Sequence, residues 1–118
     1  MAAVDLRGLI EGLELVPLTS SVSEERVTGG YVGDLLSWVM THARAGQAWI
    51  TIMNDLNIVA VAALARVSCV ILAEGVTVSS EVCRRAEEQG VCLLSSSRTA
   101  YELSAALAEL LSGEEAAP

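Results

Sequence analysis

The sequence predicts a single α/β domain whose sheet is largely parallel and is covered by helices on both faces. From Ala48 onward, short apolar segments alternate regularly with helical segments. Each short segment is continuously apolar, as in parallel strands that are buried on both faces, instead of alternating between apolar and polar residues. Hydrophobic residues make up 53% of the 118 residues but aromatic residues only 3%, so we expect one full core made of aliphatic side chains.

The N-terminal part of the chain predicts two helices and two short strands before this alternation begins. We expect a helix over 4–12, a strand over 13–18 that stops at Pro17, a strand over 26–30 that ends in a glycine pair, and a helix over 32–43.

The remaining elements follow from apolar runs bounded by polar or glycine residues. Asn54 or Asp55 can cap one helix, and Ser79 or Ser80 can cap the next, which Gly90 ends. We assign residues 1–112 to the domain and 113–118 to a flexible acidic tail. The expected order is strand 48–53, helix 56–65, strand 68–72, helix 80–89, strand 91–94 and helix 97–111.

Composition and charge exclude several classes of function. The net charge is −8, and all seven basic residues are arginines, so no P-loop lysine or Schiff-base lysine exists. The chain lacks the basic face that nucleic acid or an anionic membrane would require. The three cysteines are far apart in sequence and the single histidine, His42, is near none of them, so we expect no metal site, cofactor or disulfide. With no basic N-terminal region or long uncharged apolar run, the cytoplasm is the expected location.

The glycine pair is the first candidate for a ligand site. Thr28, Gly29 and Gly30 are expected to connect a strand to a helix, where backbone N–H groups can approach an anion and Arg26 can supply positive charge. The alternative is a tight turn in which the Thr28 hydroxyl caps the backbone.

Polar residues after two later strands form the second candidate. Ligands of parallel sheets bind beyond the carboxyl ends of the strands. Asn54, Asp55 and Asn57 follow one strand, and Ser97 and Thr99 follow another. They can bind a small polar ligand, or they can simply form turns and helix caps. Neither His42 nor Cys83 has a neighbour in sequence that would make it catalytic, and we expect no catalytic residue.

Surplus apolar surface predicts self-association. The segment 58–65 is apolar on all sides, which is hard to bury in one small domain, and the mean hydropathy is +0.51. We expect a two-fold dimer whose interface includes Tyr31, Trp38, Met40, Val59 and Ala63. The alternative is that alanines make this helix thin enough to fit between the sheet and its neighbours.

Several separated segments together resemble the DRTGG domain family. They are Arg26-Val27-Thr28-Gly29-Gly30, Gly33-Asp34-Leu35-Leu36, 57–62, Ala73-Glu74-Gly75 and 97–102. The sequence departs from the motif that names the family, because Glu25 precedes Arg26 and Val27 intervenes before Thr28. The resemblance implies an α/β domain similar to the N-terminal domain of HPr kinase/phosphorylase, which occurs beside CBS pairs in regulated pyrophosphatases, has no well-established activity of its own, and is commonly dimeric.

Two functions follow as hypotheses. The first is a non-catalytic regulatory or interaction module of the DRTGG type that dimerises, binds a small anionic ligand or nucleotide, and can meet a protein partner. The second is a small nucleotide- or phosphate-handling enzyme that uses the turn at Thr28-Gly29-Gly30, although no general base or metal site with suitable spacing accompanies it.

Overall fold

The computed structural model describes residues 3–20 and 25–116, with side chains up to residue 113. The strands are β1 (Val4–Asp5), β2 (Val16–Pro17), β3 (Arg26–Val27), β4 (Gly29–Val32), β5 (Gln47–Thr51), β6 (Cys69–Leu72) and β7 (Leu93–Ser95). The helices are α1 (Leu6–Leu13), α2 (Leu36–His42), α3 (Asn57–Ala65), α4 (Ser80–Gln89) and α5 (Ala100–Ala116).

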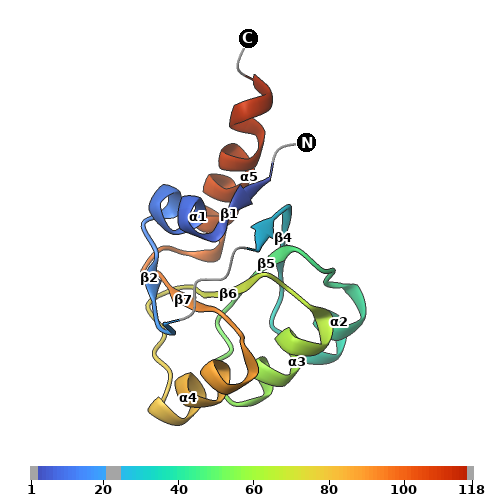
Figure 1. The fold of residues 1–118 in the computed structure, drawn as a ribbon, viewed down its shortest axis with the longest axis vertical. Helices are drawn as coiled ribbons and strands as arrows, with labels where there is room; N and C mark the ends of the chain where they lie inside the picture. The colour runs from blue at the N-terminus through green and yellow to red at the C-terminus, as the bar shows by residue number, and fades with distance from the viewer. Residues whose placement is uncertain (1–2, 21–24, 117–118) are drawn as a thin grey trace.

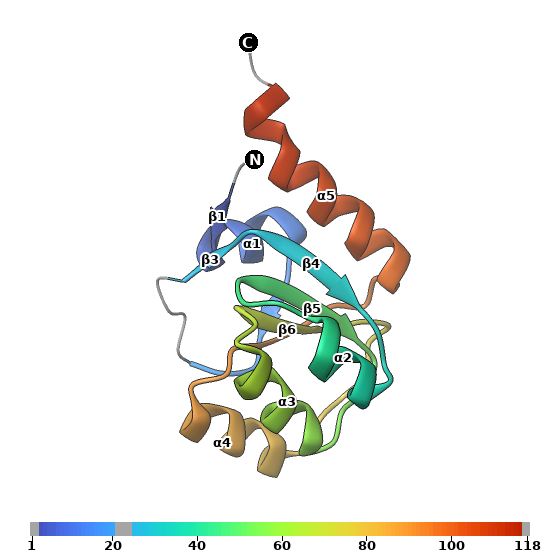
Figure 2. The ribbon, with the colours of Figure 1, turned by 90° about the vertical axis from the view of Figure 1, so that its right-hand side faces the viewer.

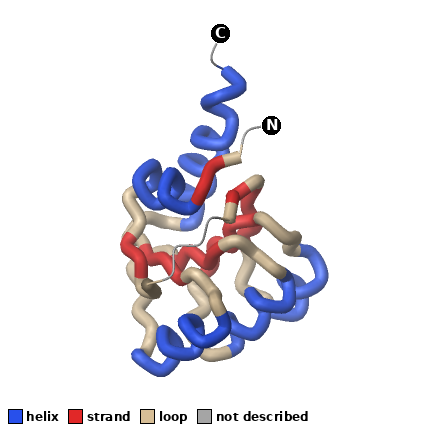
Figure 3. The backbone as a smooth tube through the Cα atoms, viewed as in Figure 1, coloured by secondary structure: helices blue, strands red, loops and turns tan. Residues whose placement is uncertain are grey.

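A five-stranded sheet in the order β2-β7-β6-β5-β4 forms the centre of the molecule. The strands β4 to β7 are mutually parallel, and β2 joins β7 in antiparallel orientation. Helices α1 and α5 lie on one face, and α2, α3 and α4 lie on the other (Figure 1). Figure 3 shows the sheet strands as one layer between these two helical layers. The predicted α/β class, with a largely parallel sheet covered on both faces, is therefore confirmed.

Alternate residues of the strands point into two separate cores. Tyr31, Trp49, Val70 and Leu93 lie side by side in the strand register and contribute to the core beneath α2, α3 and α4. Because β5, β6 and most of β7 are buried from both sides, their residues are mainly apolar, which is the pattern seen in the sequence.

The opposite face of the sheet carries two rows that differ in side-chain size. At the amino ends of the strands, the small residues Gly30, Ala48 and Cys69 are neighbours in register, and Cys92 belongs to the same core. Two residues further along, the row is large. Its members are Val32, Ile50, Ile71 and Leu94. The small row lets α5 cross close to the sheet, and Leu103 and Leu107 of α5 are buried there.

The segment around the glycine pair differs from the prediction. Gly29 and Gly30 do not end a strand; they begin β4, where Gly29 is paired with Gln47 and Gly30 with Ala48. The strand continues to Val32, so α2 starts at Leu36 and is shorter than the expected helix over 32–43. Pairing with β5 accounts for the difference, because a parallel partner satisfies the backbone of 29–32 in extended form.

The helix ends follow the predicted capping in part. Ser79 caps α4 by accepting a hydrogen bond from the Val82 N–H, and Gly90 ends it at a φ of 70°. Helix α3 has no side-chain cap, although Asp55 Oδ1 accepts from the Asn57 N–H at 3.0 Å. Helix α5 continues to Ala116, past the expected end at Leu111, and its C-terminal part projects beyond the body of the domain (Figures 1 and 2).

Candidate functional site

The carboxyl ends of the parallel strands lead into polar loops that are fixed by their own hydrogen bonds. After β4, Asp34 Oδ1 accepts hydrogen bonds from Thr51 Oγ1 at 2.7 Å and from the Ile52 N–H at 3.0 Å. Thus Asp34 ties the loop after β4 to the end of β5. Asp34 precedes α2, whose first turn contains no acidic residue.

A shallow hollow lies between the N-termini of α3 and α4 and contains two predicted ligand residues. Its volume is about 520 Å³, and its lining comprises Asn54, Asp55, Leu56, Asn57, Ser79, Glu81 and Val82. Asn54 Nδ2 donates to the Thr77 carbonyl at 2.8 Å, which holds the loop after β5 against the loop after β6. Asn57 is exposed in the first turn of α3. The structure therefore brings Asn54 and Asn57 together.

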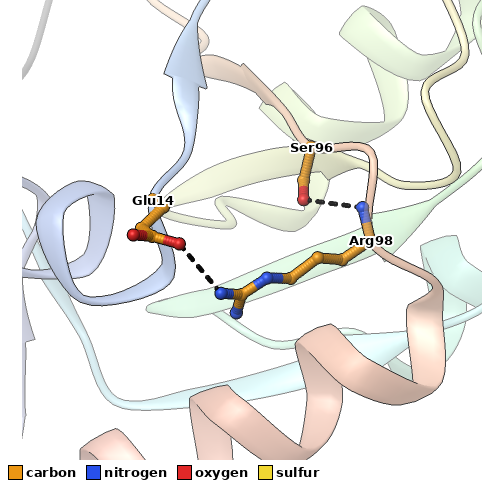
Figure 4. Close-up of polar contacts among 3 residues, drawn as sticks. All are labelled: Glu14, Ser96 and Arg98. Carbon is orange, nitrogen blue, oxygen red and sulfur yellow. Dashed lines mark hydrogen bonds and ion pairs between the residues drawn. The ribbon is translucent and has the colours of Figure 1, made fainter.

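The loop after β7 is held by backbone contacts and one ion pair. The Arg98 N–H donates to Ser96 Oγ at 3.0 Å, and an Arg98 guanidinium nitrogen donates to Glu14 Oε1 at the same distance (Figure 4). The carbonyls of Ser96 and Arg98 accept from the N–H groups of Gly75 and Glu74, respectively. Arg98 therefore links this loop to the end of α1, and its charge already has a carboxylate partner.

Thr99 is a helix cap in this structure. Its Oγ1 accepts from the Glu102 N–H at 3.1 Å, while Glu102 Oε1 accepts from the Thr99 N–H at 3.0 Å. This reciprocal pair is a capping box at the start of α5. Ser97 is exposed in the preceding loop. Thr99 therefore forms the helix cap that the sequence analysis gave as the alternative to ligand binding. Its hydroxyl group is hydrogen-bonded to the first turn of α5.

Thr28, Gly29 and Gly30 lie at the amino ends of the strands, far along the strands from Asn54, Asn57 and Ser97. The expected strand-to-helix turn at this position is wrong, since both glycines are within β4. Thr28 donates through its N–H to the Gly46 carbonyl at 2.9 Å. Arg26, in β3, donates to the Ala3 carbonyl at 2.8 Å and pairs through its strand with Asp5. The predicted ligand residues therefore do not form one site.

Close packing explains why Gly30 is a glycine. A Cβ atom built at Gly30 would lie 2.6 Å from Leu107 Cδ2 of α5. A Cβ atom at Gly29 would meet nothing closer than 3.8 Å. The absence of a side chain at Gly30 lets the Leu107 side chain of α5 lie against the sheet, which gives this glycine a packing role.

Beside these glycines, β4 and α5 enclose an apolar groove of about 390 Å³. Val32 and Ile50 of the sheet and Leu107 and Leu111 of α5 contribute its apolar surface. The remaining lining residues are small: Thr28, Gly29, Gly30, Ser104, Ala108 and Ser112. Val32, Ser104 and Ala108 are not among the residues that the sequence predicts for a site. The spacing of Ser104, Ala108 and Ser112, four residues apart along one side of α5, was the available signal.

The residues predicted for a dimer interface are only partly at the surface. Trp38 is 56% exposed and stacks on the ring of His42, with ring centroids 4.0 Å apart, and Met40 and Ala63 are exposed. Val59 is only 1% exposed, so it is corrected to a core residue. Tyr31 belongs to β4 and packs partly into the core beneath α2, and Trp38 and Met40, two positions apart, lie on different sides of α2.

The all-apolar helix α3 is half buried. Ile58, Val59, Val61 and Ala62 face the core, whereas Ala60, Ala63 and Leu64 remain exposed, Leu64 to 68%. The expectation that α3 carries more apolar surface than the domain hides is confirmed for this outer side.

Two buried thiols lie near the small row of the sheet. Burial raises the pKa of the Cys69 thiol, and the neighbouring Cys92 adds to the effect. Burial likewise raises the pKa of Cys92 to about 11, against a lowering contribution from its hydrogen bond with Thr19. A raised pKa suppresses the reactive thiolate, so these residues act as core side chains.

Within residues 3–20 and 25–116, no cluster of three or more His, Cys, Asp and Glu side chains is arranged to hold a metal ion. The helices described by the structure include none long and apolar enough to cross a bilayer.

Together, the wound sheet, the two helical layers and the internally bonded loops define the class of a small α/β domain. Among solved structures, the chain is similar to the CBS and DRTGG domains of the regulatory region of Clostridium perfringens pyrophosphatase, complexed with the activator diadenosine tetraphosphate. The sequence identity is 15% and the TM-score is 0.71. The match covers 92% of this chain, which spans about half (47%) of the pyrophosphatase chain.

A model of the DRTGG domain matches residues 22–110, which is most of the chain. The chain belongs to the DRTGG domain family. The resemblance noted in the sequence is thereby confirmed, despite the departure at Glu25 and Val27. No curated protein matches the chain.

Proposed function

We propose that this protein is a non-catalytic regulatory module that self-associates as a dimer in the cytoplasm and binds a small anionic ligand, with nucleotides as the first class to test. Membership of the DRTGG family carries the proposal, because the structurally similar chain is part of the regulatory region of a pyrophosphatase and is complexed with a dinucleotide activator. That activator belongs to the pyrophosphatase, of which this chain matches about half.

The hollow between α3 and α4 supports the ligand part of the proposal. It lies at the carboxyl ends of parallel strands, where ligands of such sheets bind, and both adjacent helices direct their N-termini toward it. Asn54 and Asn57 supply amide groups for hydrogen bonding, while Asp55 and Glu81 carry negative charge. An anion would therefore bind there better together with a divalent cation, which suits the magnesium complex of a nucleotide.

A thermal-shift titration tests the ligand proposal. AMP, ATP and diadenosine tetraphosphate are added with and without Mg²⁺, and binding to the folded state raises the melting temperature. Asn57→Ala should abolish the rise because the Asn57 side chain is exposed at the hollow. Thr28→Val, at the other end of the strands, is the matched control and should leave the rise unchanged.

The outcomes separate the parts of the proposal. A rise that survives Asn57→Ala but is lost in Thr28→Val would move the site to the glycine pair. No rise with any of the nucleotides, in a protein that remains dimeric by light scattering, would contradict the ligand part and leave an interaction role through a protein partner. Turnover of any of these nucleotides in the same samples would contradict the non-catalytic assignment.

A further inference from the structure

Strand β4 is an open edge that lacks the charges, prolines and bulges that protect many edge strands. It lies last in the order β2-β7-β6-β5-β4, and in the part of the chain that the structure describes its outer side has no strand partner. Natural edge strands are protected by charges, prolines, bulges or covering segments. The stretch Thr28-Gly29-Gly30-Tyr31-Val32-Gly33 contains no charge and no proline, and the strand pairs with β5 without a bulge.

The groove beside β4 continues this unprotected surface. None of its ten lining residues carries a charge, and Val32, at its floor, is 50% exposed. Helix α5 forms the other wall and extends beyond the domain body, as Figure 2 shows above β4. The edge strand and the groove thus form one continuous uncharged surface, to which we refer as the β4–α5 face.

The charge distribution indicates which partner fits this face. The chain carries 15 acidic and 7 basic residues. A different protein that binds an acidic chain through charge complementarity would present basic side chains. The residues lining the β4–α5 face include no carboxylate that could pair with them. Two copies of an acidic chain repel each other least where the surfaces that meet carry no charge, and the residues lining this face carry none.

We infer that the β4–α5 face is the surface through which two copies of this chain associate, with the two β4 strands paired antiparallel across a two-fold axis. This assignment rests on the dimer of the proposed function and replaces the α2–α3 surface predicted from sequence. A two-fold axis perpendicular to the sheet makes an edge strand antiparallel to its own copy and joins the two sheets. The same axis places both α5 helices on one side of the joined sheet, where each groove is closed by the other copy.

The contribution of α5 is necessary because the strand is short. Four-residue strands supply few hydrogen bonds, and a stable interface buries roughly 1,200–2,000 Å² in total. Ala108 and Leu111 of α5 and Val32 of β4 add apolar surface beside the paired strands. The pairing therefore combines main-chain hydrogen bonds with burial of apolar surface.

Two lysine substitutions on this face and one elsewhere test the inference by light scattering coupled to size exclusion. Val32→Lys on β4 and Ala108→Lys on α5 each place like charges near the two-fold axis, and each should weaken the dimer ~100-fold. Leu64→Lys is the matched control, because Leu64 is 68% exposed on α3, on the opposite side of the sheet, and should leave the dimer unchanged. Thermal melts check folding, and if Val32→Lys does not fold, Ala108→Lys decides.

Amide hydrogen exchange of the peptide containing β4 gives a second readout that helix packing alone would not change. The outward N–H groups of β4 should exchange more slowly as protein concentration rises through the dimer range. A wild-type monomer would overturn both this inference and the dimer of the proposed function. A dimer that resists both Val32→Lys and Ala108→Lys, or one that only Leu64→Lys dissociates, or unchanged exchange in β4, would overturn this inference alone.

Discussion

The two ends of the parallel strands are built in different ways. At the amino ends, Gly30, Ala48 and Cys69 form a row of small residues, and the helix above them packs close to the backbone. At the carboxyl ends, side chains such as those of Asp34 and Asn54 hold the loops together through hydrogen bonds. Residues at the amino ends of the strands therefore serve close packing, whereas residues at the carboxyl ends serve hydrogen bonding between loops.

This difference shows why a glycine pair followed by a helix is weak support for a phosphate site. Glycine is required where backbones or helices approach closely as well as where a loop surrounds an anion. At Gly30 the close neighbour is Leu107 of α5. The proposed ligand site lies instead at the carboxyl ends of the strands, where polar side chains line the hollow between α3 and α4.

The largest expected effect comes from filling the small row. Cys69→Leu adds volume to a fully buried position beneath α5 and should reduce the free energy of unfolding by up to about 3 kcal/mol, since well-packed cores resist overpacking. Urea denaturation measures the change. Cys83→Leu, at a partly exposed position of α4, is the control and should change stability far less. Equal losses of unfolding free energy in both variants would contradict the close packing of α5 on the small row.

Alkaline pH should weaken the amino-end packing next. Below pH 9.0 the thiol of Cys92 is protonated in both the folded and the unfolded chain. Because its folded pKa is raised to about 11, the unfolded chain loses the proton first, and stability falls between pH 9 and 11. The loss attributable to Cys92 should be about 2 kcal/mol, at the usual 1.36 kcal/mol per pH unit reduced for partial solvent contact.

Comparison with Cys92→Ala isolates this contribution from that of Cys69 and of the other groups in the chain. Denaturation midpoints are measured at pH 8, 9, 10 and 11 for both proteins. The variant should lose less stability than the wild type over this range. If the denaturation midpoints of both proteins fall equally between pH 9 and 11, burial of Cys92 does not cause the loss of stability at alkaline pH.

At the carboxyl end, the capping box of α5 should contribute about 1 kcal/mol. Thr99→Ala removes the acceptor of the Glu102 N–H and leaves the first turn of the helix without its cap. Thr99→Ser keeps the hydroxyl and serves as the control. Chemical denaturation of both variants checks the prediction, and a Thr99→Ala protein as stable as Thr99→Ser would contradict the capping role.

The smallest effect separates the two glycines. Gly29→Ala should raise stability by roughly 0.5 kcal/mol, because alanine reduces the entropy of the unfolded chain and its Cβ meets ordinary contacts. Gly30→Ala should give no such gain, since its Cβ would displace Leu107. Thermal denaturation measures the difference between the variants, and identical gains at both positions would show that α5 does not require a glycine at position 30.

Much of the fold could be predicted because the strands are buried on both faces. The apolar runs that overlap β5, β6 and β7, the serine cap and closing glycine of α4, and the family resemblance all lie in local sequence. Local patterns suffice there because burial on two sides demands continuous apolar residues, and helix ends demand particular capping residues.

The site could be predicted less well because it depends on which residues meet across the chain. Asn54 and Asn57 were placed at the correct end of the sheet, since they directly follow a strand. Thr28 and Gly30 were placed at the wrong end, because the pairing of β4 with β5 extends the strand to Val32 and no local signal shows that pairing. Val59 was assigned to an interface because a uniformly apolar helix does not show which side faces the core.

The sequence by itself determined the fold class, the order of the main elements and the aliphatic, lysine-free character of the chain, because these depend on composition and on periodicity between near neighbours. Only the tertiary structure decided that α5 crosses a row of small residues, that β4 is the open edge and that an uncharged groove lies between them. These features arise from contacts between residues such as Gly30 and Leu107, which are 77 positions apart and carry no pattern in common.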